Sequence, residues 1–115
     1  MNRIEELFKA KCKNVLSVYF TAGYPELRST RTIIQELARA GADIIEIGIP
    51  FSDPMADGVT IQDSSQVALA GGFTIERLFE DLKVIRKETS IPIVMMTYFN
   101  AVFKYGVERF CSQAN

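Results

Sequence analysis

Two carboxylates stand close together in the segment EIGIPFSDPMADG, Glu46 at its start and Asp57 near its end. Glu46 lies inside the apolar run 44–49, where burying an ionised side chain is costly unless something compensates for its charge. The nearest basic residues in the sequence, Arg39 and Arg77, lie outside this run. Burial favours the protonated form of a carboxyl group, so a glutamate in such a place suits proton transfer to a small-molecule substrate.

Each carboxylate also has an ordinary structural explanation. Glu46 could pair with an arginine or lysine that is distant in the sequence, or it could point into solvent. Asp57 stands between alanine and glycine and could accept backbone hydrogen bonds in a turn, and this explanation is stronger for Asp53, which precedes a proline. The small neighbours of Asp57 also allow a ligand to approach closely, so local chemistry leaves turn and site equally open.

Three nearly continuous apolar runs predict the buried strands that would position these side chains, over residues 15–20, 44–49 and 91–96. The middle run is expected to be a central parallel strand that is covered on both faces. A polar loop that begins at Pro50 follows it, and residues 98–100 are expected to form the loop after the third strand. Glu46 would then lie on a strand and Asp57 in the loop that follows it.

Helical spacing of apolar residues predicts the elements between and around the strands. The first helix, over residues 2–13, is expected to cover something apolar as a lid or plug. The second runs from Ser29 as its N-cap to Gly41 as its C-cap, and a weak third helix spans 60–70. A stronger helix over 75–85 and a last one over 107–114 follow. The inward residues of the last helix are expected to be Val107, Phe110 and Cys111.

This alternation of strands and helices is typical of βαβ units in a parallel sheet. The connection from the second strand to the third is longer than the first connection by about 20 residues, and long loops in this position commonly carry function. The turn after the first strand, TAGYPELRST, lacks the GxGxxG of a dinucleotide-binding fold, which favours a (β/α)8 TIM barrel. Because that barrel needs about 250 residues, residues 1–115 are expected to be the N-terminal part of a single barrel domain, incomplete at its C-terminus.

Composition excludes several classes of function. Thirteen basic and fourteen acidic residues are dispersed along the chain and leave a net charge of −1, which argues against a nucleic-acid partner. Cys12 and Cys111 are far apart and histidine is absent, so no zinc site is expected and both thiols are predicted to be reduced and structural. No apolar run is long enough to span a membrane and no secretory signal is present, which predicts a cytoplasmic protein.

Methionine and aromatic residues gather around the end of the third strand. They are Met95, Met96, Tyr98, Phe99 and Phe103. Such residues could line an apolar pocket, but their spacing is equally typical of core. The loop 21–25 holds a single glycine and makes a poor phosphate cradle, so no phosphate site is visible in this chain.

The segment IEIGIPFSDPMADG, residues 45–58, closely resembles the signature of the tryptophan synthase alpha subunit family. FTAGYP after the first strand and PIVMMTYFNAVFKYG around the third also resemble this family, so the resemblance covers the whole chain. It implies a (β/α)8 barrel whose N-terminal helix closes the barrel floor. It also implies a retro-aldol lyase of tryptophan biosynthesis, which cleaves indole-3-glycerol phosphate into indole and glyceraldehyde 3-phosphate without metal or organic cofactor.

The resemblance also implies roles for individual residues. Glu46 matches the family's acid–base group, which protonates indole C3 and takes a proton from the glycerol hydroxyl. Asp57 matches the carboxylate that hydrogen-bonds the indole N–H. Four residues match the apolar slot for the indole ring, namely Tyr19, Ile61, Met96 and Tyr98, and three match loops that face the beta subunit, namely Pro50, Asp53 and Asn100. That partner carries pyridoxal phosphate and is expected to form an alpha2-beta2 tetramer with this subunit.

The family's phosphate-binding loops, and a tyrosine that adjoins the catalytic glutamate, come from the later half of the barrel. The 115-residue chain alone is therefore expected to have little or no lyase activity. Two other interpretations remain open at this point. One is a different phosphate-handling barrel enzyme that shares this half of the barrel, and the other is a non-catalytic fragment that retains the loop 50–58 as a docking module for a beta subunit.

Overall fold

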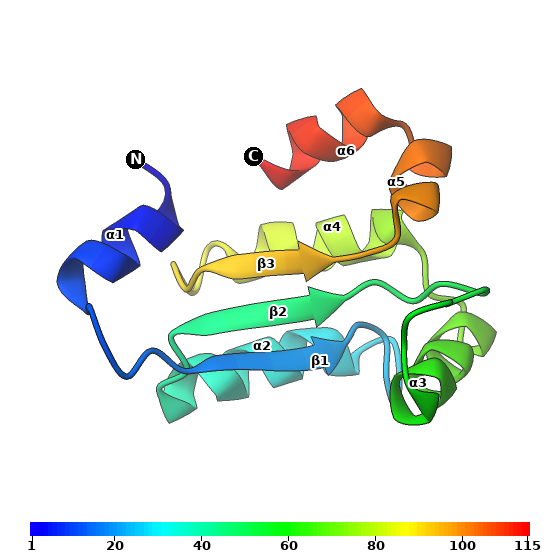
Figure 1. The fold of residues 1–115 in the computed structure, drawn as a ribbon, viewed down its shortest axis with the longest axis horizontal. Helices are drawn as coiled ribbons and strands as arrows, with labels where there is room; N and C mark the ends of the chain where they lie inside the picture. Colours follow the sequence, from blue (N-terminus) through cyan, green and yellow to red (C-terminus); the bar gives the residue numbers. More distant parts are fainter.

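The computed structural model describes all 115 residues and shows a three-stranded parallel sheet (Figure 1). The strands are β1 (Ser17–Thr21), β2 (Ile44–Gly48) and β3 (Ile93–Met96), and they pair in the order β1-β2-β3. The helices are α1 (Arg3–Ala10), α2 (Ser29–Ala40), α3 (Val59–Ala70), α4 (Ile75–Ile85), α5 (Phe99–Tyr105) and α6 (Val107–Ala114). All three predicted strands are present, each one or two residues shorter than its apolar run.

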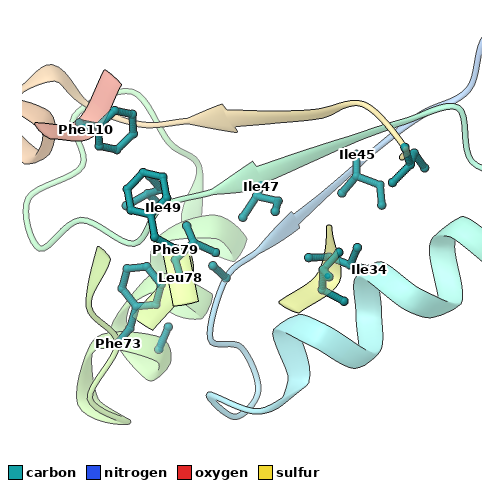
Figure 2. Close-up of a cluster of buried hydrophobic side chains, with 12 residues drawn as sticks. Ile34, Ile45, Ile47, Ile49, Phe73, Leu78, Phe79 and Phe110 are labelled. Carbon is teal, nitrogen blue, oxygen red and sulfur yellow. The ribbon is translucent and has the colours of Figure 1, made fainter. Parts of the chain in front are cut away.

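Helices α2 and α4 lie along one face of the sheet, and the hydrophobic core fills the space between them and β2 (Figures 1 and 2). Ile45 and Ile47 point from β2 toward these helices and are fully buried. Alternate residues of a strand point to opposite faces, so Glu46 must point away from this core. The apolar run of β2 therefore contributes every second side chain to the core.

The opposite face of the sheet is open. Tyr19 on β1, Glu46 on β2 and Val94 on β3 lie in register across it, and no helix crosses in front of these strands (Figure 1). Met96, on the same face of β3, is 55% exposed. The prediction that the central strand is covered on both faces is thus wrong for these 115 residues, because helices cover only one side of the sheet.

Two helix boundaries differ from their sequence predictions. Ser29 is the first residue of α2 rather than its N-cap, which is Arg28 and makes no side-chain capping bond. Residues 98–100 are not simply a loop, because α5 begins at Phe99. The expected end of α2 is confirmed, since Gly41 adopts a left-handed conformation with a φ of 93° that favours glycine.

The last helix, α6, begins and ends at the predicted residues, but only one of its three predicted inward residues is buried. Phe110 is buried and its ring meets the ring of Phe79 edge-on, with centroids 5.3 Å apart (Figure 2). Val107 is 40% exposed and Cys111 is also exposed, so their predicted inward orientation is wrong. Both cysteines are free thiols, as predicted, but each is exposed and neither belongs to the core.

Helix α1 lies by the N-terminal ends of the strands (Figure 1). Asn2 and Glu5 form a capping box at its start, and none of its residues is buried. At its far end Lys11 Nζ contacts Asp43 Oδ2 at 2.6 Å, and the backbone N–H of Leu16 donates to the same oxygen at 2.8 Å. Both bonds lower the pKa of the Asp43 carboxyl group below its usual value, and the bond from the Leu16 backbone has the larger effect. Asp43 thus ties α1 to the start of β2.

A buried carboxylate joins the two helices of the covered face. Asp81 on α4 is 2% exposed, and its Oδ1 accepts from Nε of Arg31 on α2 at 2.7 Å and from Nε of Arg77 at 3.4 Å. A buried carboxylate with two cationic partners is compensated. Asp81 is therefore a structural link between α2 and α4.

Candidate active site

A small cleft of about 160 Å³ opens at the carboxyl ends of the strands, where the loops after β2 and β3 meet. Its walls are formed by Tyr19, Gly48, Ile49, Ala56, Asp57, Ile61, Ser65, Met96, Thr97 and Tyr98. The four residues predicted to form an apolar slot are all among them, and so is one of the two predicted carboxylates. Residues from all three strands, two loops and α3 are thus brought together at one place.

The shape of this cleft depends on a close approach between β1 and β2. The Tyr19 side chain lies directly over Gly48, because a Cβ atom built on that glycine would stand only 2.0 Å from the tyrosine hydroxyl oxygen. Any larger residue at position 48 would force the ring to move. Gly48 therefore fixes where the Tyr19 ring forms one wall of the cleft.

The loop that carries Asp57 is held from two sides. On one side the Ala56 N–H donates to the Tyr98 hydroxyl at 2.9 Å, and the Tyr98 ring stacks on Phe51 with centroids 5.1 Å apart. On the other side Gln62 Nε2 on α3 donates to the Asp57 carbonyl oxygen at 2.7 Å. The backbone around Asp57 is thus positioned by groups outside the loop itself.

The Asp57 carboxylate is left free by these contacts. It is partly buried, accepts no hydrogen bond and makes no ion pair. The turn explanation required its side chain to accept backbone N–H groups, and it accepts none. Asp53 behaves differently, because it is exposed and its Oδ2 accepts from the Ser52 hydroxyl at 2.7 Å. Only Asp57 presents an uncommitted carboxylate to the cleft.

Glu46 is partly buried on the open face of the sheet, opposite Tyr19. It pairs with no arginine or lysine, so the explanation by a distant cationic partner is wrong in this structure. Its single side-chain bond is to Ser17, whose hydroxyl donates to Glu46 Oε1 at 2.6 Å. Glu46 does not line the cleft, although it shares a face of the sheet with Tyr19 and Gly48. The two predicted carboxylates are neighbours in the fold but do not meet.

A larger groove of about 400 Å³ lies next to α4, α5 and α6. Pro50 and Asn100, two of the residues expected to face a partner, form part of its wall, while Asp53 lies outside it. Neither Glu46 nor Asp57 lines this groove, so we place the candidate chemistry in the smaller cleft. Two other residues of α5, Phe99 and Phe103, are exposed, and their ring centroids lie 6.1 Å apart.

Several residues of the site were missed by sequence reasoning. Ser17, Gly48 and Gln62 had no predicted role, although each holds a predicted site residue in place. The signal for Ser17 was its spacing, since a residue two positions before Tyr19 on a strand points to the same face. No group of three or more cysteine, aspartate or glutamate side chains could hold a metal ion, and no helix is long and apolar enough to cross a membrane.

Comparison with known proteins gives the same family by sequence and by structure. The family model for the tryptophan synthase alpha chain matches residues 6–115. The tryptophan synthase alpha chain of Flavobacterium psychrophilum is 54% identical over 113 residues, which are 98% of this chain and 44% of that protein. The chain therefore spans less than half the length of the curated relatives it matches.

Solved structures of the family share this arrangement of strands and helices. The crystal structure of tryptophan synthase subunit alpha from Legionella pneumophila superimposes with a TM-score of 0.93 at 39% identity, covering 99% of this chain and 45% of that one. The tryptophan synthase complex from Pyrococcus furiosus gives a TM-score of 0.81 at 44% identity, covering 88% and 42%. The three parallel strands are thus part of a TIM-barrel fold, and the chain belongs to the tryptophan synthase alpha chain family.

Proposed function

We propose that the protein containing this chain cleaves indole-3-glycerol phosphate into indole and glyceraldehyde 3-phosphate. The observation that carries the proposal is the meeting of Asp57 with four apolar-slot residues in one cleft, beside Glu46 on the same face of the sheet. The cleft volume of about 160 Å³ is comparable with apolar cavities of about 150 Å³ that bind benzene. A cleft of this size suits one flat aromatic group.

Glu46 is the proposed acid–base residue. A retro-aldol cleavage needs a proton on indole C3 and the removal of a proton from the glycerol hydroxyl, while the bond between C3 and the glycerol carbon breaks. The electrons of that bond return to the ring, and the hydroxyl carbon becomes the aldehyde of glyceraldehyde 3-phosphate. One carboxyl group can serve both transfers if it can move, and the lack of any ionic partner leaves Glu46 free to do so.

Asp57 is the proposed electrostatic partner of the ring. Protonation of C3 places positive charge on the indole nitrogen, and a fixed carboxylate that accepts the N–H stabilises this charge. Asp57 suits this role because its carboxylate is uncommitted and its backbone is anchored by Gln62. Tyr19, Ile61 and Met96 would then hold the two faces of the ring.

The first test replaces Glu46 by glutamine in the native-length protein. Loss of a general acid–base group typically costs about 10²- to 10⁴-fold in rate, so we expect E46Q to lower kcat by a factor in this range with little change in stability. E80Q is the matched control, because Glu80 is exposed and makes no side-chain bond. Wild-type protein without lyase activity, or an E46Q variant as active as E80Q, would overturn the proposal.

The second test separates this substrate from other phosphate esters. Indole-propanol phosphate should bind the native-length protein more tightly than a plain sugar phosphate, as measured by calorimetry. The difference should shrink in D57N, because that variant removes the acceptor for the indole N–H, but not in D63N, which alters an exposed and unbonded aspartate. Equal binding of both ligands would favour a different phosphate-handling barrel enzyme.

The groove side of the molecule is the proposed docking surface for a tryptophan synthase beta subunit that carries pyridoxal phosphate, in an alpha2-beta2 assembly. The solved relative from Pyrococcus furiosus is described as a tryptophan synthase complex, which supports this part of the proposal. Pro50 and Asn100 line the groove and Asp53 lies in the loop that begins at Pro50, and these three residues would form the contact. N100K should weaken co-purification with a beta subunit, whereas S90K, at the opposite ends of the strands, should not.

Two further proposals concern the whole protein. Residues 1–115 are the N-terminal part of a single barrel domain, and this domain works in the cytoplasm. The isolated 115-residue chain should therefore show little or no turnover of indole-3-glycerol phosphate. Turnover by the purified chain that disappears in E46Q would show this expectation to be wrong.

A further inference from the structure

Ser17 makes the single side-chain contact of Glu46. Its hydroxyl donates to Glu46 Oε1 at 2.6 Å, which is in the range of about 2.5–2.7 Å that is typical of a hydroxyl bonded to an ionised carboxylate. No arginine or lysine competes for this carboxylate. Among residues 1–115, one neutral donor thus holds the Glu46 carboxylate.

This contact turns the carboxylate away from the cleft. Ser17 lies opposite Ile44 in the sheet, two residues nearer the N-terminal ends of the strands than Glu46. The cleft lies in the other direction, around Gly48 and Asp57, and Glu46 is not part of its wall. A carboxylate bonded to Ser17 therefore points toward the wrong end of the sheet for a ligand in the cleft.

We propose that Ser17 is a positioning residue that holds the Glu46 carboxylate in a resting position outside the cleft. This inference rests on the proposed role of Glu46 as the acid–base residue. To reach a ligand beside Asp57, Glu46 must break its bond to Ser17 and turn toward the carboxyl ends of the strands.

The surroundings leave this movement open. Across the sheet Glu46 faces Tyr19 on one side and Val94 on the other, and neither bonds its side chain. Among residues 1–115, the titratable side chains of the cleft wall toward which Glu46 would turn include Tyr19 and Asp57, and two carboxylates at close range repel each other. Within residues 1–115, Ser17 is the only residue whose side chain bonds the Glu46 carboxylate.

A protein whose competent conformation is only partly populated reacts in proportion to that population. Removing the hydroxyl in S17A should shift Glu46 toward the cleft in the substrate complex. We expect kcat for indole-3-glycerol phosphate to rise by about two- to tenfold, the factor that corresponds to one exposed hydrogen bond, with KM unchanged. S17T keeps a hydroxyl on a strand-compatible side chain and should behave as wild type.

A gain in kcat separates this role from simple damage, because a disturbed strand would lower activity. The inference is overturned if S17A has an unchanged or lower kcat, or if S17T behaves as S17A. Crystal structures of the native-length protein provide a readout that does not depend on turnover. We expect the contact between Ser17 and Glu46 in the wild type, and a carboxylate turned toward Asp57 in S17A.

These readouts also distinguish the two proposals from each other. If the wild type has no lyase activity and E46Q changes nothing, the proposed function fails, and the crystal structures then decide the positioning role alone. A Glu46 carboxylate in the same place in wild type and S17A would overturn that role. An active wild type whose kcat is not raised by S17A would leave the lyase function standing and remove Ser17 from the mechanism.

Discussion

The two sides of the β-sheet both hold carboxylates but surround them differently. On the helix-covered side Asp81 is 2% exposed and bonded by Arg31 and Arg77. On the open side Glu46 has one serine, and at the mouth of the cleft Asp57 has no side-chain partner at all. A carboxylate with cationic partners is held in one place and one state, whereas a carboxylate without them can change position or bind a ligand. This difference separates the structural acidic groups from the candidate catalytic ones, and it can be tested by substitution.

The largest effect on stability is expected when Asp81 loses both of its arginine partners. The double variant R31A/R77A leaves Asp81 buried without a cation, which should lower the free energy of unfolding by about 3–5 kcal/mol in urea titrations of the native-length protein. Adding D81A should recover part of that loss, because no buried charge then remains. D81A alone should cost less than the double variant, since both arginines are more than 40% exposed and can turn to water.

If D81A alone were as damaging as R31A/R77A, the pairing would not explain why Asp81 is tolerated in the core. E46Q is the counterpart on the open side and should leave the free energy of unfolding almost unchanged.

A smaller effect is expected where β1 and β2 touch on the open side. In G48A the new methyl group would meet the Tyr19 ring and displace it, at a cost of about 1–3 kcal/mol in stability. Affinity for indole-propanol phosphate should fall, because the displaced ring is a wall of the cleft. G41A is the control, since no atom lies within 4 Å of a Cβ there, although its φ of 93° adds strain at that position. Unchanged ligand affinity in G48A would show that Tyr19 does not shape the site.

The loop that carries Asp57 should respond to loss of a single hydroxyl. Y98F removes the acceptor for the Ala56 N–H but keeps the ring that stacks on Phe51, so we expect a local loss of about 0.5–1.5 kcal/mol. Hydrogen exchange should become faster at Ala56 while the strands stay protected. Y105F is a matched control, because the Tyr105 hydroxyl bonds Gln113 on α6 and no group of this loop. Equal exchange in Y98F and wild type would mean that the loop does not depend on Tyr98.

The smallest effect concerns pH at the start of β2. The Leu16 N–H and Lys11 lower the pKa of Asp43 in the folded state, so this group stabilises the fold above its unfolded pKa of about 3.9. That stabilisation is lost as the pH falls through the lower folded pKa. Unfolding midpoints measured between pH 7 and pH 2 should thus fall less steeply in D43N than in wild type or D63N. Parallel curves for all three would show that Asp43 does not contribute.

The strands could be predicted from the sequence because each is a continuous apolar run, and the resemblance to the alpha chain family placed the runs in a barrel. The ion pair that joins α2 to α4 could not be predicted as easily. Asp81 falls among the apolar residues of α4, and its partner Arg31 is 50 positions away, so nothing local marks it as a buried ion pair. Helix α5 was also missed, because a helix of 7 residues depends on its packing rather than on its own propensity.

The candidate site was predictable only in part, because local sequence does not show which distant residues contact it. Local chemistry around Glu46 gave a costly buried charge, but within residues 1–115 Glu46 is only partly buried on the open face of the sheet, with no cation beside it. Local chemistry around Asp57 could not separate a turn from a site. The difference lies in Tyr98 and Gln62, which satisfy the loop backbone from other elements and leave the aspartate side chain free.

The hydrogen bond from Ala56 to Tyr98 also has a consequence for the synthesis of this chain on the ribosome. The two residues are 42 positions apart. At a translation rate of about 5–20 residues per second, roughly 2 to 8 s separate the synthesis of Ala56 from that of Tyr98. During that interval the loop that carries Asp57 lacks its hydrogen bond to Tyr98. The same loop holds Met55, whose side chain is exposed in the folded chain. The mouth of the cleft is therefore completed only after the third strand has been made, because the loop has no hydrogen bond to Tyr98 until then.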